Sequence, residues 1–279
     1  MPKEFADPES LDLIGPNSGS CDLFVLTRLA ESLPGKEENL ASGEWIENQC
    51  QFVERYSRPS LECQTDSSFM WIVSVSDRLS TPLVNRVRRA VEPFGTIIFQ
   101  QGDEHSSDTF ARFLARQSEE YLTVRFDSDD VLHPAFVENA KSCLQRDSEV
   151  FSFMSGVVYD LDRQIAGYWP HPSNTFLFHR GAAGANVYGL GVHSRVESVY
   201  GRTMKIVSTS HPMWMKLTHS ANGWGDTITD ADRPLFGDFV QRNFISGSFL
   251  TAFRLRRDGL RILGFLASRL RRNLRKPPR

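Results

Sequence analysis

Short apolar runs alternate with amphipathic stretches along the first 160 residues of the chain. The runs have the length of buried strands and are rich in Val, Ile, Leu and Phe. The stretches between them place apolar residues at helical spacing. The predicted strands are residues 21–28, 69–75, 96–100, 121–126 and 149–159. The predicted helices are residues 44–56, 83–91, 108–119 and 134–144, with a further helix or turn at 59–64.

This alternation predicts the α/β class, with an open, mostly parallel sheet flanked by helices. Residues 160–247 are rich in Gly, His and aromatics, and we expect loops, short strands and one or two helices that complete a site. The expected organisation is a disordered leader over residues 1–20, one domain over 21–247, and a basic amphipathic helical tail over 248–279.

Amino-acid composition further narrows the kind of protein that this chain can be. The 279 residues can bury a sizeable core, and the four cysteines form no C-x-x-C pair, which argues against a structural zinc site. The N-terminal stretch lacks the apolar segment of a signal peptide, and no run of about 18 apolar residues occurs. We therefore expect a cytoplasmic protein.

The net charge is only -2, but the charged residues are distributed unevenly along the chain. The segment from Arg254 to Arg279 holds ten Lys or Arg and one acid, Asp258, so that the rest of the chain is strongly acidic. Leu and Phe recur in this tail at helical spacing with Arg between them, which is typical of helices that bind anionic membrane surfaces. We expect the tail to reach the inner face of the plasma membrane, or else to pack on the domain. An acidic body excludes nucleic acid as the main partner.

The strongest chemical signal is the turn Asp127-Ser128-Asp129-Asp130, directly after the predicted strand at 121–126. Ligands of open α/β sheets bind beyond the carboxyl ends of the strands. Crowded carboxylates repel one another, and Mg²⁺ or Mn²⁺ relieves the repulsion while also holding substrate phosphates. The alternative is a solvated turn that caps the helix beginning near Pro134. Arg125, just before the turn, is a cation for a diphosphate or a partner of Asp127.

The segment YLTVRFDSDDVLHPAFVENA resembles the D-x-D region of the GT-A fold glycosyltransferases. More narrowly, the chain resembles the bacterial rhamnosyltransferase family over about residues 21–225. Three segments carry this resemblance: RPSLECQTDSSFMWIVSVSDRLSTP, TVRFDSDD and MWMKLTHSANG. The family often has Arg-Phe-Asn after its first strand, where this chain has Arg28-Leu29-Ala30.

The resemblance implies a nucleoside diphosphate sugar as donor, and a divalent metal, Mn²⁺ or Mg²⁺. The implied metal ligands are Asp127, Asp129, Asp130 and a late histidine, His219, with His211 and His193 as weaker candidates. The implied donor-binding residues are Thr27, Arg28, Asp77, Arg125 and Asp127.

An inverting transferase also needs a base for the acceptor hydroxyl. We select Asp226, which follows Gly223-Trp224-Gly225, with Glu197 and Asp160 left open as alternatives.

The predicted function is metal-dependent transfer of a sugar, rhamnose or another hexose, to a glycan or lipid-linked acceptor in cell-envelope polysaccharide synthesis. A nucleotidyltransferase would need a Gly-rich phosphate loop, and residues 27–43 lack a convincing one. The remaining alternative is a catalytically inactive glycan-binding or scaffold protein with the same fold. The donor sugar, the acceptor, the stereochemistry and the oligomeric state are left open by the sequence.

Overall fold

The computed structural model describes residues 21–31, 42–92, 94–117, 119–172, 174–191, 193–200, 203–219, 233–235 and 244. The predicted leader, the basic tail and Asp226 lie outside the described residues. No helix among the residues that the structure describes is both long enough and apolar enough to cross a bilayer.

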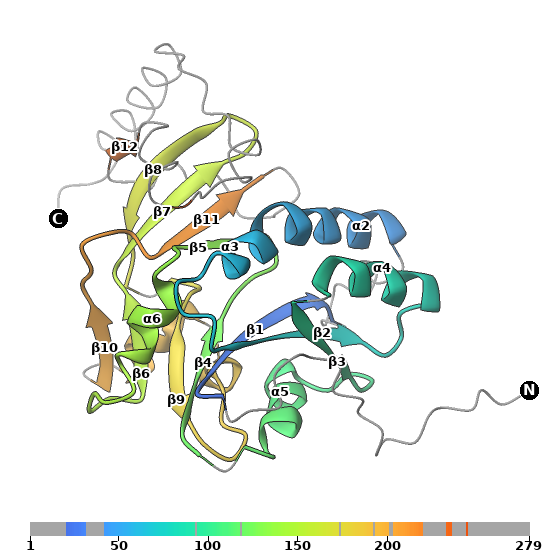
Figure 1. Ribbon diagram of the computed structural model, residues 1–279, viewed down its shortest axis with the longest axis horizontal. Coiled ribbons are helices and arrows are strands. Elements are labelled where there is room, and N and C mark those ends of the chain that lie inside the picture. Colours follow the sequence, from blue (N-terminus) through green and yellow to red (C-terminus); the bar gives the residue numbers. More distant parts are fainter. Residues whose placement is uncertain are drawn as a thin grey trace, which may run out of the picture.

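A seven-stranded sheet forms the centre of the molecule, with strand order β10-β6-β9-β4-β1-β2-β3 (Figure 1). Strands β4, β1, β2 and β3 run parallel to one another, as the sequence predicts, whereas β9 is antiparallel to both of its neighbours. The strands are β1 (Leu23–Ala30), β2 (Met70–Ser76), β3 (Gly95–Gln100), β4 (Tyr121–Arg125), β6 (Val150–Phe153), β9 (Phe178–Gly181) and β10 (Met204–Val207).

Helices cover both faces of this sheet. Helices α2 (Gly43–Phe52) and α4 (Thr81–Val91) lie on one face, and α5 (Ser106–Leu114) lies on the other (Figure 1). The alternating side chains of β1 explain the two layers, since Val25 packs in the core beneath α2 while Phe24 packs with Phe110 of α5. The mixed α/β class with a largely parallel sheet is therefore confirmed.

A second, five-stranded sheet was not predicted. Its strand order is β12-β8-β7-β11-β5, and only the pair of β7 and β11 is parallel. Its strands are β5 (Val131–Leu132), β7 (Ser155–Asp160), β8 (Ile165–Pro170), β11 (Trp214–Thr218) and β12 (Arg233–Leu235). The single strand predicted over 149–159 is wrong, because β6 and β7 belong to different sheets.

Trp214 of β11 lies beside this division, because it pairs with Gly156 of β7 and its indole N–H donates to the Phe153 carbonyl at the end of β6. A Cβ at Gly156 would lie 2.2 Å from the Trp214 ring, so only glycine allows the ring to lie against the start of β7. Along the sequence the run through 149–159 is mostly apolar, and apolar composition does not report which sheet a strand joins.

Helix α2 continues without a break into a π-helical turn, η1 (Val53–Ser57), and then into α3 (Arg58–Glu62). The Arg58 N–H donates to the Val53 carbonyl, five residues back. Pro59 gives a physical reason for the wider turn, because proline has no N–H to donate and its ring would clash with the carbonyl four residues earlier in an α-helix. The predicted helix at 44–56 and the predicted helix or turn at 59–64 are thus one element.

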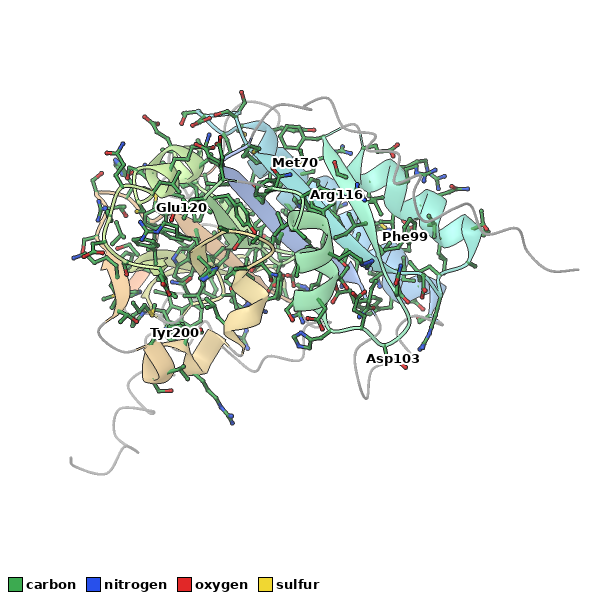
Figure 2. The ribbon with its side chains drawn as sticks, turned by 90° about the horizontal axis from the view of Figure 1, so that it is seen from below. Met70, Phe99, Asp103, Arg116, Glu120 and Tyr200 are labelled. Carbon is green, nitrogen blue, oxygen red and sulfur yellow. The ribbon has the colours of Figure 1, made fainter. Side chains whose placement is uncertain are left out.

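Three short helices complete the described structure: α6 (Phe136–Lys141), the 3₁₀ turn η2 (Val187–Leu190) and α7 (His193–Tyr200). Figure 2 places Phe99, on the edge strand β3, far from Tyr200 of α7, which packs near the opposite edge strand β10.

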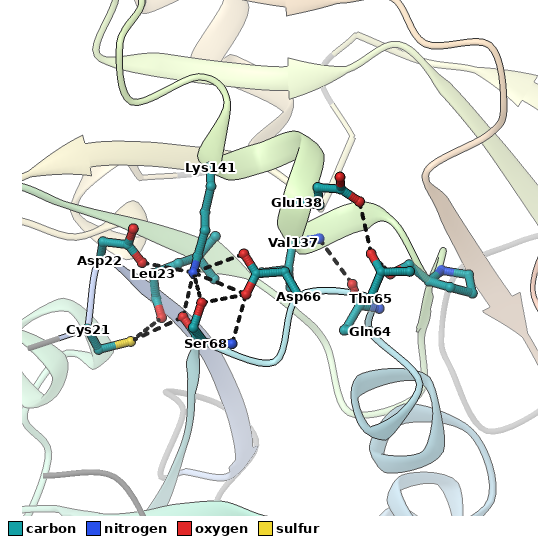
Figure 3. Close-up of polar contacts among 11 residues, drawn as sticks. Cys21, Asp22, Leu23, Gln64, Thr65, Asp66, Ser68, Val137, Glu138 and Lys141 are labelled. Carbon is teal, nitrogen blue, oxygen red and sulfur yellow. Dashed lines mark hydrogen bonds and ion pairs between the residues drawn. The ribbon is translucent and has the colours of Figure 1, made fainter. Parts of the chain in front are cut away.

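A polar cluster ties α6 to the starts of β1 and β2 (Figure 3). The Lys141 Nζ lies 3.0 Å from Asp22 Oδ1 and 3.2 Å from Asp66 Oδ2, and it donates to the Ser68 carbonyl at 2.6 Å. The Lys141 side chain is only 13% exposed, whereas its partner Asp22 is 51% exposed, so that water screens this ion pair in part. The cluster fixes the helix that follows the acidic turn.

We expect Lys141→Met to lower the free energy of unfolding by about 1–3 kcal/mol, because it leaves two carboxylates and a carbonyl without their shared donor. Urea unfolding would measure the change. Lys205→Met, at an exposed position of β10, is the matched control and should shift stability by under about 0.5 kcal/mol. Equal effects of the two substitutions would contradict a stabilising role for the cluster.

Candidate active site

The acidic turn connects the two sheets. It leaves β4 of the first sheet at Arg125 and enters β5 of the second at Val131. The Phe126 N–H donates to the Leu26 carbonyl of β1, and the Asp130 N–H donates to the Asp127 carbonyl. The turn therefore lies at the carboxyl edge of the parallel strands, where the sequence places it.

Asp127 lies among cations. Arg125 Nε and an Arg125 terminal nitrogen lie 3.4 and 3.5 Å from its two oxygens. Burial by itself would raise the pKa of Asp127, but the charges of Arg125, Lys216 and Arg28 outweigh it and lower the pKa to about 2. Asp127 is therefore ionised at neutral pH, and its charge is already balanced by the protein.

The cations are held by an aromatic ring that the sequence did not indicate. The guanidinium carbons of Arg28 and Arg125 lie 4.9 and 5.5 Å from the centre of the Tyr188 ring, and that ring stacks on Phe110. Burial raises the pKa of Tyr188 to about 12, so its hydroxyl stays protonated and points to the Leu26 carbonyl. Cation–π contact of this kind brings two guanidinium groups to one place.

Asp130 points inward rather than toward the other carboxylates. Its side chain is fully buried, Oδ1 accepts the Leu217 N–H at 3.0 Å, and Oδ2 lies 4.0 Å from Lys216 Nζ. Burial raises its pKa well above the ordinary value, with Asp129 and Asp127 adding to the rise against Lys216. The structure therefore does not bring Asp130 to the place where Asp129 and His219 meet.

Asp129, in the turn between the two sheets, faces His219, which directly follows β11 of the second sheet. Asp129 Oδ2 lies 3.2 Å from His219 Nε2, although the residues are 90 positions apart in the chain. The His219 ring stacks on Phe52 of α2 with centroids 4.1 Å apart. Of the four predicted metal ligands, the structure thus pairs these two directly.

The donor set decides whether a divalent cation fits. In the described part of the chain, no three His, Cys, Asp or Glu side chains are arranged to hold a metal ion. A carboxylate oxygen and an imidazole nitrogen 3.2 Å apart suit Mn²⁺, and such ions are commonly held by one or two side chains together with substrate phosphates. The residues present therefore fit a two-ligand site that a diphosphate completes, in place of the four ligands predicted.

Several other residues that were predicted for the site lie away from Asp129 and His219. Thr27 is fully buried and its hydroxyl accepts the Trp71 indole N–H at 2.9 Å, so it faces the core and not the acidic turn. Arg28 contributes to the positive charge around Asp127, and its contact with the donor stays a prediction. Asp77 lies exposed after β2 and accepts the Gly102 N–H, which caps a turn. Of the alternative bases, Asp160 is bonded to Arg163, and the side chain of Glu197 is not described.

The sequence analysis did not indicate three residues that contact or surround Asp127 and His219: Lys216, Tyr188 and Phe52. Lys216 belongs to the MWMKLTHSANG segment, and a lysine in an otherwise apolar strand is a signal that could have been used. The positions of Tyr188 and Phe52 follow from packing alone. His211, a weaker ligand candidate, instead stacks on His133.

His133 is held neutral near this site. Burial lowers its pKa to about 4, the nearby His211 adds to the effect, and Nδ1 accepts the Ala135 N–H at 3.1 Å. A folded-state pKa below the unfolded value of about 6.5 means that the stabilising contribution is full above pH 6.5 and is lost as the pH falls toward 4.

We expect the wild type to lose about 2–3 kcal/mol more stability between pH 6.5 and 4.5 than His133→Asn, whose amide oxygen can still accept from Ala135. Urea unfolding at the two pH values measures this difference, and other titrating groups cancel between the two proteins. Parallel losses in both proteins would show that His133 does not titrate in this range.

Comparison with known proteins places the chain among the glycosyltransferases. The model of the family described as "Putative rhamnosyl transferase" matches residues 26–229, and the chain belongs to this family. The resemblance noted from the three sequence segments is thereby confirmed. A search among curated proteins finds no match.

Several solved structures overlap with the chain at low identity. TarS residues 1–349 from S. aureus share 9% identity, with a TM-score of 0.42 over 91% of this chain and 72% of that one. The mannosyltransferase PcManGT from Pyrobaculum calidifontis, in complex with GDP-Man and Mn²⁺, shares 10% identity, with a TM-score of 0.42 over 96% and 79%. The inositol-1-phosphate CTP transferase from T. maritima shares 13%, with a TM-score of 0.39 over 73% and 91%. Overlaps this distant say nothing about which substrate this chain uses.

Proposed function

We propose that this chain transfers a sugar, rhamnose or another hexose, from a nucleoside diphosphate sugar to a glycan or lipid-linked acceptor in cell-envelope polysaccharide synthesis. One observation carries the proposal. In a member of a glycosyltransferase family, Asp129 faces His219 beside three cations, Arg28, Arg125 and Lys216, that surround Asp127. Anionic and cationic groups so close together suit a diphosphate and its counter-ion.

The anionic and the cationic residues of the site have different roles in this proposal. Asp129 and His219 would hold Mn²⁺ or Mg²⁺, which when bound supplies positive charge for the departing diphosphate. Arg28 and Arg125, held on Tyr188, offer guanidinium groups that match phosphate oxygens. Asp127 orients Arg125 through its two contacts. Lys216 keeps a positive charge beneath the turn, because the carboxylates raise its pKa although burial lowers it.

Two parts of the proposal concern residues outside the described structure. Asp226 is the proposed base that takes the proton of the acceptor hydroxyl. The basic tail is the proposed contact with an anionic membrane surface, at the cytoplasmic side of the plasma membrane. Such a contact would bring the enzyme to a lipid-linked acceptor.

Calorimetric titration with UDP, GDP and TDP and their sugars, with and without Mn²⁺, tests the donor site. We expect the wild type to bind one nucleotide family in a metal-dependent way and Asp129→Ala to lose the metal dependence. The preferred base and sugar would then identify the donor. Absence of nucleotide binding under all these conditions would overturn the proposal and favour a catalytically inactive glycan-binding protein.

A further inference from the structure

The continuous helix α2–η1–α3 contacts the acidic turn through the side chains of Ser57 and Gln49. Ser57, at the end of the π turn, is fully buried, and its hydroxyl lies 2.5 Å from the Ser128 carbonyl and 3.1 Å from the Asp130 carbonyl. Gln49, two turns earlier, accepts the Ser128 hydroxyl on its Oε1 at 2.8 Å. Ser128 is therefore held by the same helix at its carbonyl and at its side chain.

The place of Ser128 in the turn gives these bonds their consequence. It lies between Asp127, which contacts Arg125, and Asp129, which contacts His219. A rotation of the Ser128 peptide would move both neighbouring carboxylates, because they share its backbone. Fixing that peptide therefore fixes the separation of Asp129 from His219.

The same helix also holds His219. Phe52, the last residue of α2, stacks on the His219 ring at an interplanar angle of 25°. One helix thus determines the positions of both members of the proposed metal pair. The π turn contributes because the extra residue in its wider turn sets the register in which Ser57 follows Phe52 and Gln49, and π turns occur often at functional sites.

We propose that Gln49 and Ser57 are positioning residues that align Asp129 with His219 through Ser128, without touching substrate. This inference rests on the function proposed above, since it assigns a task to the helix in that site. The buried hydroxyl of Ser57 also stabilises the fold, because Ser57→Ala would leave two carbonyl groups without this donor. A purely structural role would change stability and leave metal binding as it is.

The test measures Mn²⁺ binding, from the electron paramagnetic resonance signal of free Mn²⁺, with Mn²⁺ alone and with UDP, GDP or TDP. We expect Gln49→Met to weaken Mn²⁺ binding in the presence of the nucleotide about three- to tenfold, the size expected for one hydrogen bond. Ser57→Ala should weaken it at least as much. Gln51→Met, an exposed glutamine on the same helix, is the matched control and should leave Mn²⁺ binding unchanged.

A double-mutant cycle tests whether Gln49 acts on Mn²⁺ binding through Ser128. If Gln49 acts through the Ser128 hydroxyl, Ser128→Ala alone, Gln49→Met alone and the double variant weaken Mn²⁺ binding equally. Additive losses, or unchanged Mn²⁺ binding in variants with lowered melting temperatures, would overturn the positioning role. If the wild type binds nucleotide and Mn²⁺ while the variants bind equally well, only this inference fails. If the wild type binds neither, the proposed function fails and the inference fails with it.

Discussion

Asp129→Asn should lower the rate of sugar transfer by about two to three orders of magnitude, because an amide is a far weaker ligand for Mn²⁺ than a carboxylate. The metal contributes several kcal/mol of charge stabilisation to the departing diphosphate, and each 1.4 kcal/mol changes a rate tenfold. Its partner His219 lies 3.2 Å away, so His219→Asn should lower the rate through the same site. Initial rates measured against Mn²⁺ concentration check both expectations.

The transfer rate of the double variant distinguishes two residues that hold one ion from two residues that act independently. If they hold one ion, the Asp129→Asn, His219→Asn double variant loses little more than the worse single variant. Asp108→Asn, at an exposed position in the first turn of α5, is the matched control and should keep the wild-type rate. Wild-type rates in Asp129→Asn would rule out a metal ligand at this position.

Asp130→Ala should destabilise the fold by about 2–4 kcal/mol, the second large effect that we expect. The substitution removes the acceptor of the buried Leu217 N–H and the carboxylate nearest to Lys216. Asp130→Asn keeps an oxygen for the Leu217 N–H and should cost about 1 kcal/mol or less. Urea unfolding without metal measures both variants.

The same pair of variants distinguishes a structural carboxylate from a metal ligand. If Asp130 fixes β11 to the turn, Asp130→Asn keeps most of the wild-type affinity for Mn²⁺ in the presence of nucleotide. If Asp130 binds the ion, Asp130→Asn weakens Mn²⁺ binding as strongly as Asp129→Asn does. Stable Asp130→Ala protein would contradict the buried contacts themselves.

Local sequence pattern was enough for the four parallel strands β1, β2, β3 and β4 of the first sheet. The runs at 69–75, 96–100 and 121–126 correspond to β2, β3 and β4, since buried parallel strands are continuously apolar and the intervening helices are amphipathic. The second sheet was missed because its strands are short and three of its four pairings are antiparallel. Such pairings depend on contacts between distant segments, as the Trp214 ring over Gly156 illustrates.

The candidate site was predicted in composition and only partly in geometry. The D-x-D turn was singled out because carboxylates after a buried strand are conspicuous, and the late histidine because it lies in the third resembling segment. Both lie within the residues that the family model matches, and their role as metal ligands stays a prediction. Thr27 was expected near the donor but bonds to Trp71 in the core. The alternation of side chains predicts which residues share one face of a strand. Which of the two faces lies next to the ligand depends on the elements that pack on each side of the sheet.

By itself, the sequence determined the α/β class, the position of the acidic turn at a strand's carboxyl edge and membership of a glycosyltransferase family. These follow from local hydrophobic periodicity and from short motifs. Tertiary structure alone decided that Asp130 turns inward to Leu217 while Asp129 meets His219, and that Ser57 and Gln49 hold the turn. The physical reason is that the direction of a side chain in a turn depends on which buried polar groups need partners, and those partners lie about 70 to 90 residues away along the chain.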